Sequence, residues 1–598
     1  MNYFNYIKEI NDSQSKNTSK KPDIKALAFL LPYIKLNSPK ILLSLLLMLV
    51  VAIIALPAPY LIKYIIDSLL PQKDIFHISY IIALIVALYL IKVILSLTIS
   101  YLFSLISNNI QVQLRKDIFH KIISLPLSFS NKTQSGYLVA RLNETQGLNV
   151  LFSSNILGLV IDILEMLFIS TILLTMNVKM TLITICFIPI YMIIYKKFSL
   201  GLISSSRSKY ETTAKLSEKI QESFSGISTV KSFSSEKRET AKITEYLNGF
   251  YKASITQNIL VSIATELVFL VSSVVSLIIL WFSIYEIIGG RFTIGMYFAF
   301  SAYSIKLLLP IQKLAAVSVN IQPAMAALIR IIDIKERISE TDDKRRNKDI
   351  QSLKGKIEFQ NVSFKYDEKA NINALENINF QISPGSKIAI VGESGAGKTT
   401  LISLVLQLYS PTAGKILFDN IDSQDIIIPT LREKIGYVSQ DIFLFEDTIK
   451  NNIIYGRPNA DDSEIINASK ESGAFEFINK LSNGFNTIIG ERGINLSLGQ
   501  KQKLSIARAL LLNPDMFIFD EATSSLDSIS QKEIQNFIKN TNNKTVIMIA
   551  HNIETVLLSD FVLVLKNGRL IEKGIPSELL KMESHFYNLF YNSKILAI

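Results

Sequence analysis

The sequence predicts a multidomain chain, in which an all-α membrane domain with six spans is followed by an α/β domain that binds phosphate. The first observation is compositional: the chain is 49% hydrophobic and 19% charged, and its apolar excess lies almost entirely before residue 330. The second is a phosphate-loop motif, Gly392 to Thr399, well after the last apolar segment. Since 598 residues exceed the usual length of one domain, we expect several structural units.

The expected units follow the composition along the chain. Residues 1–38 should form a cytoplasmic tail and a surface helix, because the chain starts with a polar stretch and Lys25–Lys35 has apolar residues at helical spacing. Residues 39–330 contain the spans and their long loops, and the charge-rich residues 331–355 indicate a solvated linker. The α/β domain takes residues 356–598.

Six apolar segments are long enough to cross a bilayer, for which about 20 helical residues suffice. We expect them near residues 40–67, 78–107, 150–176, 178–200, 258–287 and 293–320. Pro57 and Pro59 interrupt the first segment, which is tolerated where neighbouring helices satisfy the freed carbonyl groups. The sequence therefore predicts a six-helix membrane domain with one interrupted span.

Basic residues concentrate in two long connections, Arg115–Arg141 after the second span and Lys196–Lys252 after the fourth. The positive-inside rule places both connections, the N-terminus and the α/β domain in the cytoplasm. Orientation in a lipid bilayer thus explains the net charge of +11, and nucleic acid is not expected as a partner. The single Cys186 excludes an intramolecular disulfide. Abundant Ile, Asn and Lys favour a bacterial source, and hence the bacterial inner (cytoplasmic) membrane.

Four charged residues lie within the expected spans: Lys92, Asp162, Glu165 and Lys306. Charges at that depth are costly and usually face a cavity or a partner. One interpretation is mutual neutralisation, for example of Glu165 by Lys92 or Lys306, which would hold helices in register. The other is direct contact with a transported molecule.

The phosphate loop carries the first half of a nucleotide site. It follows an apolar run, Lys387 to Val391, that indicates a strand, and precedes a run, Leu401 to Leu408, that indicates a helix. Such a loop aims backbone N–H groups and a helix N-terminus at phosphate oxygens, while the lysine adds charge and the threonine offers a hydroxyl to magnesium. The expected nucleotide-binding residues here are Gly392, Glu393, Ser394, Gly395, Ala396, Gly397, Lys398, Thr399 and Thr400.

Two adjacent carboxylates carry the second half. Met516 to Phe519 indicates a buried parallel strand that ends in Asp520 and Glu521. Asp520 can hold the magnesium shell, usually through water, and Glu521 can position or polarise the attacking water. The alternative is a strand that ends in two solvated acids.

Between the two halves lies Leu496-Ser-Leu-Gly-Gln500, which resembles the signature Leu-Ser-Gly-Gly-Gln of ATP-binding-cassette (ABC) transporters. Further motifs of that family match in order: Tyr366 where the family stacks an aromatic on adenine, Gln440 where it has a glutamine that reaches magnesium and senses the membrane domain, and His551 where it has a switch histidine near the γ-phosphate. Gly490-Glu-Arg-Gly493 resembles an exporter loop, and Ser524-Ser-Leu-Asp527 resembles the loop that crosses the dimer interface.

The resemblance implies an α/β P-loop ATPase domain of ABC type, with ATP and Mg²⁺ bound. Thr399, Gln440 and Asp520 would be the metal ligands, and Glu521 and His551 the catalytic residues. Ser497, Gly499, Gln500 and Asp527 would complete the site of the opposite subunit. Residues 129–142 and 217–233 resemble exporter segments with coupling helices.

Leu498 departs from the pattern, because the family usually has its first signature glycine there. Glycine allows close approach or unusual backbone angles, and leucine adds a bulky side chain. Either this side chain points away and is tolerated, or the composite site is weakened, as in asymmetric two-chain relatives.

The resemblance further implies an exporter-type half-transporter with a second half-transporter as partner, in a homodimer or in a heterodimer with a related chain. ATP-driven export or leaflet flipping of a hydrophobic or amphipathic cargo is the expected function, and the cargo could be a drug, a lipid or a peptide. Two alternatives remain open: a non-transporting ATPase that regulates another membrane protein, and the weaker-site subunit of a heterodimeric exporter. A soluble cassette protein is excluded by hydropathy.

Overall fold

The computed structural model describes residues 28–595 apart from 134, 341, 344, 368–371, 491–492, 523–527, 542 and 583. Its contacts divide the chain into two units. The membrane unit comprises residues 1–123 and 135–337, and the cassette unit comprises residues 124–134 and 338–598. Each unit has its own core.

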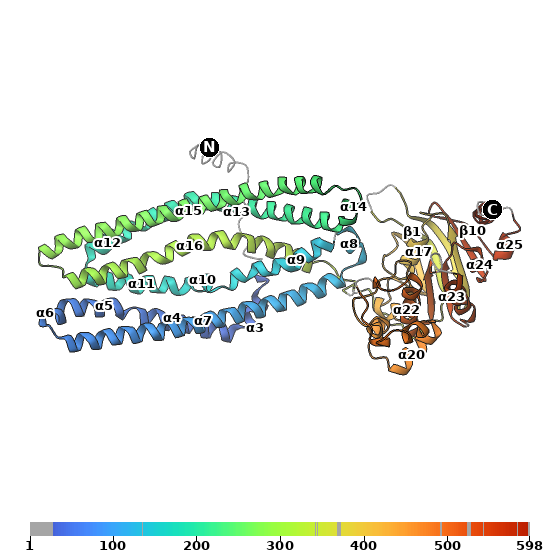
Figure 1. Ribbon diagram of the computed structural model, residues 1–598, viewed down its shortest axis with the longest axis horizontal. Coiled ribbons are helices and arrows are strands. Elements are labelled where there is room, and N and C mark those ends of the chain that lie inside the picture. Colours follow the sequence, from blue (N-terminus) through green and yellow to red (C-terminus); the bar gives the residue numbers. More distant parts are fainter. Residues whose placement is uncertain are drawn as a thin grey trace. The chain divides into compact units, whose positions relative to one another are not determined.

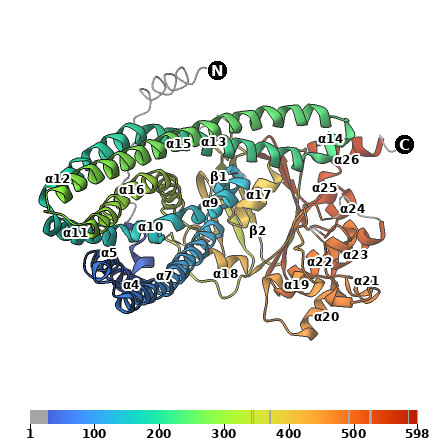
Figure 2. The same ribbon diagram turned by 60° about the vertical axis from the view of Figure 1, so that its left-hand side comes forward.

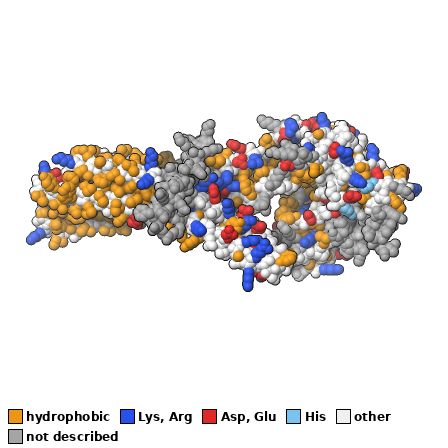
Figure 3. Space-filling view, turned by 90° about the horizontal axis from the view of Figure 1, so that it is seen from above, with side chains coloured by type: hydrophobic (Ala, Val, Ile, Leu, Met, Phe, Trp, Pro, Cys, Tyr) orange, Lys and Arg blue, Asp and Glu red, His pale blue; other side chains and the backbone are white. Residues whose placement is uncertain are grey.

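The membrane unit is all-α, and its described part contains six helical segments long and apolar enough to span a bilayer. Its helices are α3 (Leu31–Leu36), α4 (Ser38–Ala55), α5 (Pro57–Tyr64), the π-helix η2 (Ile65–Leu69), α6 (Leu70–Gln72), α7 (Ile75–Ser124), α9 (Ser135–Gly147), the 3-10 helix η3 (Leu148–Phe152), α10 (Ser154–Leu157), α11 (Leu159–Met176), α12 (Val178–Cys186), α13 (Ile188–Ser225), α14 (Ile227–Ser232), α15 (Glu236–Ile288) and α16 (Ile294–Lys335). Hydrophobic side chains dominate the visible surface of the spans (Figure 3). The predicted membrane domain with six spans is therefore confirmed.

The third span begins at Leu159 rather than near residue 150. Ser153 has an extended backbone, with φ −73° and ψ 154°, and it separates η3 from α10. Gly158 follows, and a Cβ there would lie 2.6 Å from the Met48 methyl group, so this turn packs closely on the first span. An apolar run alone does not reveal such a break, because hydropathy is the same on both sides of it.

Several helices are much longer than a bilayer requires. α15 has 53 residues and α7 has 50, so that at 1.5 Å per residue each is about 75–80 Å long, against a hydrocarbon core of about 30 Å. α13 and α15 run side by side and are joined by α14 (Figures 1 and 2). The helices of the two long connections thus continue far beyond the apolar segments.

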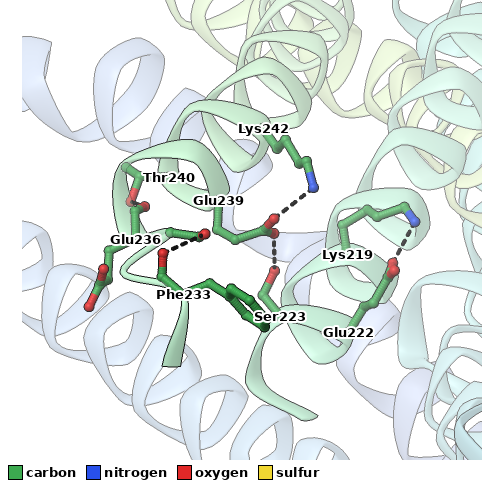
Figure 4. Close-up of polar contacts among 9 residues, drawn as sticks. Lys219, Glu222, Ser223, Phe233, Glu236, Glu239, Thr240 and Lys242 are labelled. Atoms are coloured by element: carbon green, nitrogen blue, oxygen red, sulfur yellow. Dashed lines mark hydrogen bonds and ion pairs between the residues drawn. The ribbon is translucent and has the colours of Figure 1, made fainter. Parts of the chain in front are cut away.

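Polar contacts tie the α13–α14–α15 tip together (Figure 4). Glu239 of α15 accepts hydrogen bonds from Lys242, at 2.6 Å, and from Ser223 of α13, at 3.3 Å. At the end of α14, Lys231 pairs with Glu236 at 2.9 Å, while the neighbouring Phe233 side chain is exposed. The tip is therefore a fixed turn that presents an apolar side chain to its surroundings.

The cassette unit contains two sheets. The four-stranded sheet has the order β2 (Leu375–Ile382), β1 (Ile357–Phe364), β4 (Ala413–Phe418), β5 (Ile421–Asp422), and its neighbours pair antiparallel. The six-stranded sheet has the order β10 (Arg569–Gly574), β9 (Phe561–Lys566), β3 (Lys387–Gly392), β8 (Thr545–Ile549), β7 (Met516–Asp520), β6 (Ile435–Val438). All its pairs are parallel except β10–β9. The predicted α/β domain is confirmed.

Helices cover both faces of the six-stranded sheet, which explains its continuous apolar strands. Ile388 and Ile390 of β3 face a core shared with α17 (Lys398–Val405) and the four-stranded sheet, and Ala389 and Val391 face α22 (Leu498–Leu511) and α23 (Ser528–Asn540). The remaining helices are α8 (Leu127–Lys132), α18 (Ile428–Arg432), α19 (Ile449–Ile453), α20 (Asp462–Glu471), α21 (Phe475–Asn479), α24 (Ile553–Val556), α25 (Pro576–Leu579) and α26 (His585–Ile595), with 3-10 turns η4 (Ile454–Gly456) and η5 (Gly484–Asn486).

Candidate nucleotide-hydrolysing site

The site lies where four neighbouring strands end. β3 ends at Gly392, β8 at Ile549, β7 at Asp520 and β6 at Val438. β3 pairs with β8, β8 with β7, and β7 with β6, all in parallel. Because the carboxyl ends of parallel strands share one edge of a sheet, the loops that follow them converge. Sheet order thus assembles motifs that are far apart in the sequence.

The phosphate loop requires glycine at two of its positions. Gly397, the N-cap of α17, has φ +101°, and a Cβ there would lie 2.7 Å from Leu375. A Cβ on Gly392 would lie 2.3 Å from the Leu565 carbonyl oxygen. The loop thus lies so close to β9 and to the start of β2 that only glycine fits at these two positions, and α17 begins directly after Gly397.

Lys398 is folded back over the phosphate loop. Its Nζ donates hydrogen bonds to the carbonyl oxygens of Gly392, at 2.9 Å, and Glu393, at 3.0 Å. Burial lowers the pKa of the Lys398 ammonium, an effect that the charges of Glu521 and Asp520 oppose. An anion that accepts hydrogen bonds from this ammonium would replace the two carbonyl oxygens.

Glu521 is held from two sides. Gln440 Nε2 donates to its Oε2 at 2.7 Å, and His551 Nε2 lies 2.7 Å from its Oε1. The side chain is 16% exposed, and the backbone has φ +51°, an uncommon conformation for glutamate that costs roughly 1–3 kcal/mol. Two hydrogen bonds and a strained backbone therefore fix the Glu521 carboxylate at the C-terminal end of β7.

Asp520 is nearly inaccessible, at 2% exposure. The Tyr437 hydroxyl donates to its Oδ2 at 3.4 Å, whereas Oδ1 has no hydrogen-bond partner within the part of the chain that the structure describes. Burial, followed by the charge of Glu521, raises the pKa of Asp520 to about 6. A buried acceptor oxygen without a donor suits a hard cation such as Mg²⁺.

A magnesium site here would use only a few protein side chains as ligands. No group of three or more His, Cys, Asp or Glu side chains in the described ranges could hold a metal ion alone. Mg²⁺ typically takes one or two protein ligands and completes its shell with water and substrate phosphates. The unpartnered Asp520 oxygen beside the phosphate loop matches that pattern, with Thr399 and Gln440 as the further candidate ligands.

Tyr366 lies beside the first turn of α17. Its hydroxyl is 3.0 Å from Thr400 Oγ1, and its ring meets that of Tyr409 edge-on at 5.3 Å. The residue is 49% exposed, which leaves ring surface available for stacking. Tyr409 in turn accepts a hydrogen bond from Asn131 of α8, at 2.6 Å. α8 therefore contacts the cassette next to the candidate adenine-stacking residue.

The signature forms the start of α22. Ser497 is the N-cap, and it exchanges hydrogen bonds with Gln500 in a capping box. Leu498 is the first helical residue, lies outside the left-handed region and is 43% exposed. Glycine's special backbone freedom is thus not required at this position, and the two interpretations of Leu498 differ only in whether its exposed side chain weakens the composite site. Gly499 follows inside the helix.

Three predicted features lie outside the described residues: Asp527, the rest of its loop from Ser524, and the two central residues, 491 and 492, of the exporter-like loop. Tyr437 and Tyr409 are the residues that sequence reasoning missed. Tyr437 lies on β6 next to β7, and its position three residues before Gln440 could have indicated a neighbour of Asp520. No sequence pattern indicated the contact between Tyr409 and α8.

Comparisons with known proteins define the class of this fold and site. The family model described as "ABC transporter transmembrane region" matches residues 41–311, and the one described as "ABC transporter" matches residues 375–524. An ATP-dependent lipid A-core flippase of Desulfotalea psychrophila is 33% identical over 91% of this chain and 95% of that protein. The chain therefore belongs to the ABC transporter family.

Two further relatives narrow the type. The leukotoxin export ATP-binding protein LtxB of Aggregatibacter actinomycetemcomitans is 30% identical over 91% of this chain and 76% of that protein. A bacterial Atm1-family ABC exporter solved with ATP bound shares 26% identity at a TM-score of 0.84, with 93% of this chain and 99% of that chain covered. The chain is thus an exporter-type, multi-pass membrane protein with an ATP-hydrolysing cassette.

Proposed function

We propose that two half-transporters, either two copies of this chain or this chain and a related one, use ATP to export or flip a hydrophobic or amphipathic cargo. The observation that carries the proposal is the pair of 2.7 Å contacts on Glu521, which prepare a base beside a phosphate loop in a chain with six spans. One chain supplies one cassette, whereas the signature of a second chain would face the bound nucleotide. The N-terminus and the cassette would lie in the cytoplasm of a bacterium.

Different residues of the site would bind ATP and hydrolyse it. Backbone N–H groups of the phosphate loop and Lys398 would hold the phosphates, and Tyr366 would stack on adenine. Ser497, Gly499 and Gln500 would reach the γ-phosphate bound by the partner, and Asp527 would lie at the subunit interface. Glu521 would accept the proton of the attacking water, with His551 orienting it and stabilising charge near the γ-phosphate.

Magnesium would be held by Thr399, Gln440 and Asp520. When bound, the metal would supply positive charge that neutralises the negative charge developing during phosphoryl transfer. Gln440 would connect the metal site to the catalytic base, because its amide nitrogen donates a hydrogen bond to Glu521. If Gln440 turned its amide oxygen toward the metal, its hydrogen bond to Glu521 Oε2 would break.

The Mg²⁺ concentration that ATP binding requires should vary with pH, because Asp520 is a candidate metal ligand that titrates. The pKa of about 6 means that the carboxyl is largely neutral below that pH, whereas a metal ligand must be ionised. We expect the Mg²⁺ concentration for half-maximal ATP binding to be constant above about pH 7 and to rise about tenfold per unit below pH 6. Tyr437→Phe, which removes a hydrogen-bond donor to Asp520, should raise the pH below which the required Mg²⁺ concentration begins to increase. A flat dependence down to pH 5 would contradict the assignment.

The same shift predicts a stability effect. The pKa of Asp520 in the folded protein lies above the ordinary 3.8. The contribution of this carboxyl group to the free energy of folding is therefore fully present below pH 3.8 and is lost as the pH rises through 6. Asp520→Asn should therefore raise the Tm of the nucleotide-free protein at pH 7.5, and the gain should shrink toward pH 4. Thermal unfolding at several pH values tests this, and a gain independent of pH would oppose it.

Transport itself needs a vectorial assay. Purified chain in proteoliposomes, with a fluorescent phospholipid as probe, should show ATP-dependent movement of the probe between leaflets that stops with Glu521→Gln. Because a lipid A-core flippase and a leukotoxin exporter are both relatives, the test should be repeated with inverted vesicles, to which ATP and an amphipathic peptide are added outside and in which accumulation of the peptide inside is measured. Normal ATP hydrolysis without movement of either probe would favour a regulatory ATPase.

A further inference from the structure

The first span is broken by two prolines, and one backbone carbonyl loses its partner there. In an α-helix the N–H of residue i donates to the C=O of residue i−4. Pro57 therefore removes the donor for Ile53 O, and Pro59 removes the donor for Ala55 O. Ile53 O accepts from Leu56 N instead, at 3.1 Å. Ala55 O has no such replacement along its own helix.

Water cannot replace this missing donor readily. Ala55 and Ala58 are 6% and 3% exposed, and Pro59 is also buried. An unsatisfied carbonyl at membrane depth costs several kcal/mol, so that a broken span needs donors from its neighbours. The chain must therefore supply a donor to Ala55 O from another helix.

Lys306 of α16 is that donor. Its Nζ donates to Ala55 O at 2.6 Å, and Tyr303, one turn earlier on α16, donates its hydroxyl to Leu56 O at 2.5 Å. Tyr303 is 1% exposed, so both contacts lie at a packed junction of the first and sixth spans. An intramembrane lysine that binds a backbone carbonyl has a structural reason for its position.

A second attachment joins the same two spans farther along. Asp67 of η2 accepts hydrogen bonds from Thr293 Oγ1, at 2.5 Å, and from Gly295 N, at 2.9 Å, and so caps the start of α16. A Cβ on Gly295 would lie 2.6 Å from Lys63 O, so that the two backbones approach closely. Residues 57–72, here called the 57–72 segment, are thus attached to α16 just before their start, through Ala55 and Leu56, and again within the segment, through Asp67.

We infer that Lys306 is a positioning residue: it supplies the hydrogen bond that Pro59 removes and so holds the 57–72 segment against the sixth span. This role differs from the two interpretations that its charge suggested, neutralisation of Glu165 and contact with cargo. It also explains why a lysine and a proline occur in register on neighbouring spans. The lysine at position 306 is needed because the proline at position 59 has no N–H.

Suppression tests this relationship directly. Lys306→Met should lower the Tm of the full-length protein in lipid nanodiscs, without nucleotide or cargo, by about 3 °C or more, because Ala55 O is left unsatisfied. Pro59→Ala restores an N–H at the position that faces Ala55 O. We expect Pro59→Ala/Lys306→Met to recover at least half of the loss, while Pro59→Ala alone has little effect.

The matched control is Pro57→Ala/Lys306→Met. Pro57→Ala also removes a proline from the first span, but its N–H would face Ile53 O, which already has Leu56 N. It should not rescue Lys306→Met. Equal rescue by both alanines would mean general repair of the helix, and no rescue by Pro59→Ala would mean that Lys306 acts elsewhere; either result overturns the inference.

Two further results separate the competing roles. Glu165→Gln should leave the Tm nearly unchanged, whereas a loss as large as that of Lys306→Met, not rescued by Pro59→Ala, would indicate an ion pair and refute the inference. If Lys306→Met does not accumulate in membranes, the Pro59→Ala double variant should accumulate and the Pro57→Ala double variant should not. These readouts require neither transport nor hydrolysis, so they stand apart from the proposed function.

Discussion

Glu521→Gln is expected to lower Mg-ATP hydrolysis by the purified chain in lipid by about 10²–10⁴-fold, the usual contribution of a general base. Glutamine keeps the shape of the side chain and one acceptor oxygen for Gln440, but it cannot take a proton from water. Nucleotide binding should persist, because Glu521 lies at the end of β7 and not in the phosphate loop. Phosphate release and binding of a fluorescent ATP analogue measure the two effects separately.

Glu554→Gln is a suitable control for that experiment. Glu554 is an exposed acid in the first turn of α24, three residues after His551, and its backbone N–H is bound by Asn552. Its replacement should leave hydrolysis within about twofold, as surface substitutions usually do. If Glu521→Gln retained more than a tenth of the wild-type rate, another group would have to be the base.

The wild-type rate in the same experiment decides how Leu498 is understood. Robust hydrolysis by the purified chain would mean that two copies make a working site and that a helical leucine at the start of α22 is tolerated. A rate no higher than that of Glu521→Gln would point to a missing partner chain or a required cargo. A search for a related half-transporter that copurifies with this chain would then follow.

Lys398→Met is expected to abolish nucleotide binding as well as hydrolysis. Methionine has nearly the same length and volume, but it carries no charge and donates no hydrogen bond. Two loop carbonyls, on Gly392 and Glu393, would lose their donor, and the phosphates would lose a charge-assisted hydrogen bond. We expect ATP affinity to fall at least about 100-fold, or about 2.8 kcal/mol.

Lys387→Met provides the comparison, because Lys387 lies at the opposite end of β3, where its Nζ donates to Lys539 O at 2.8 Å. It removes the same charge from the same strand without touching the loop, and affinity should stay within about twofold. Binding by Lys398→Met within threefold of wild type would show that the loop backbone alone holds the phosphates. The contrast with Glu521→Gln, which should bind without hydrolysing, separates the two halves of the site.

The nucleotide site could be predicted because its information is local. Each motif is a short run in which strand, loop and helix follow one another, and parallel pairing of β3, β8 and β7 then brings the runs together. The prediction of Asp520 and Glu521 at a strand end needed only an apolar run followed by two acids. The left-handed backbone of Glu521 could not be predicted, because an apolar run followed by two acids does not specify a positive φ.

The membrane unit was less predictable in detail. Hydropathy identified six spans, but the break at Ser153 leaves no trace in it. The hydrogen bond from Lys306 to Ala55 O could not be predicted, because sequence alone does not reveal which carbonyl on another helix needs a donor. The answer required the tertiary pairing of the first and sixth spans, although the two prolines had already indicated that some neighbour must satisfy freed carbonyls.

The π-helical turn η2 also sets the direction in which the Asp67 side chain points. A π-turn holds one residue more than an α-helical turn, and each residue rotates an α-helix by about 100°. Loss of one residue between Ile65 and Leu69 would therefore swing Asp67 away from Thr293 and Gly295. The length of this turn, and not only the identity of its residues, therefore directs Asp67 toward the start of the sixth span.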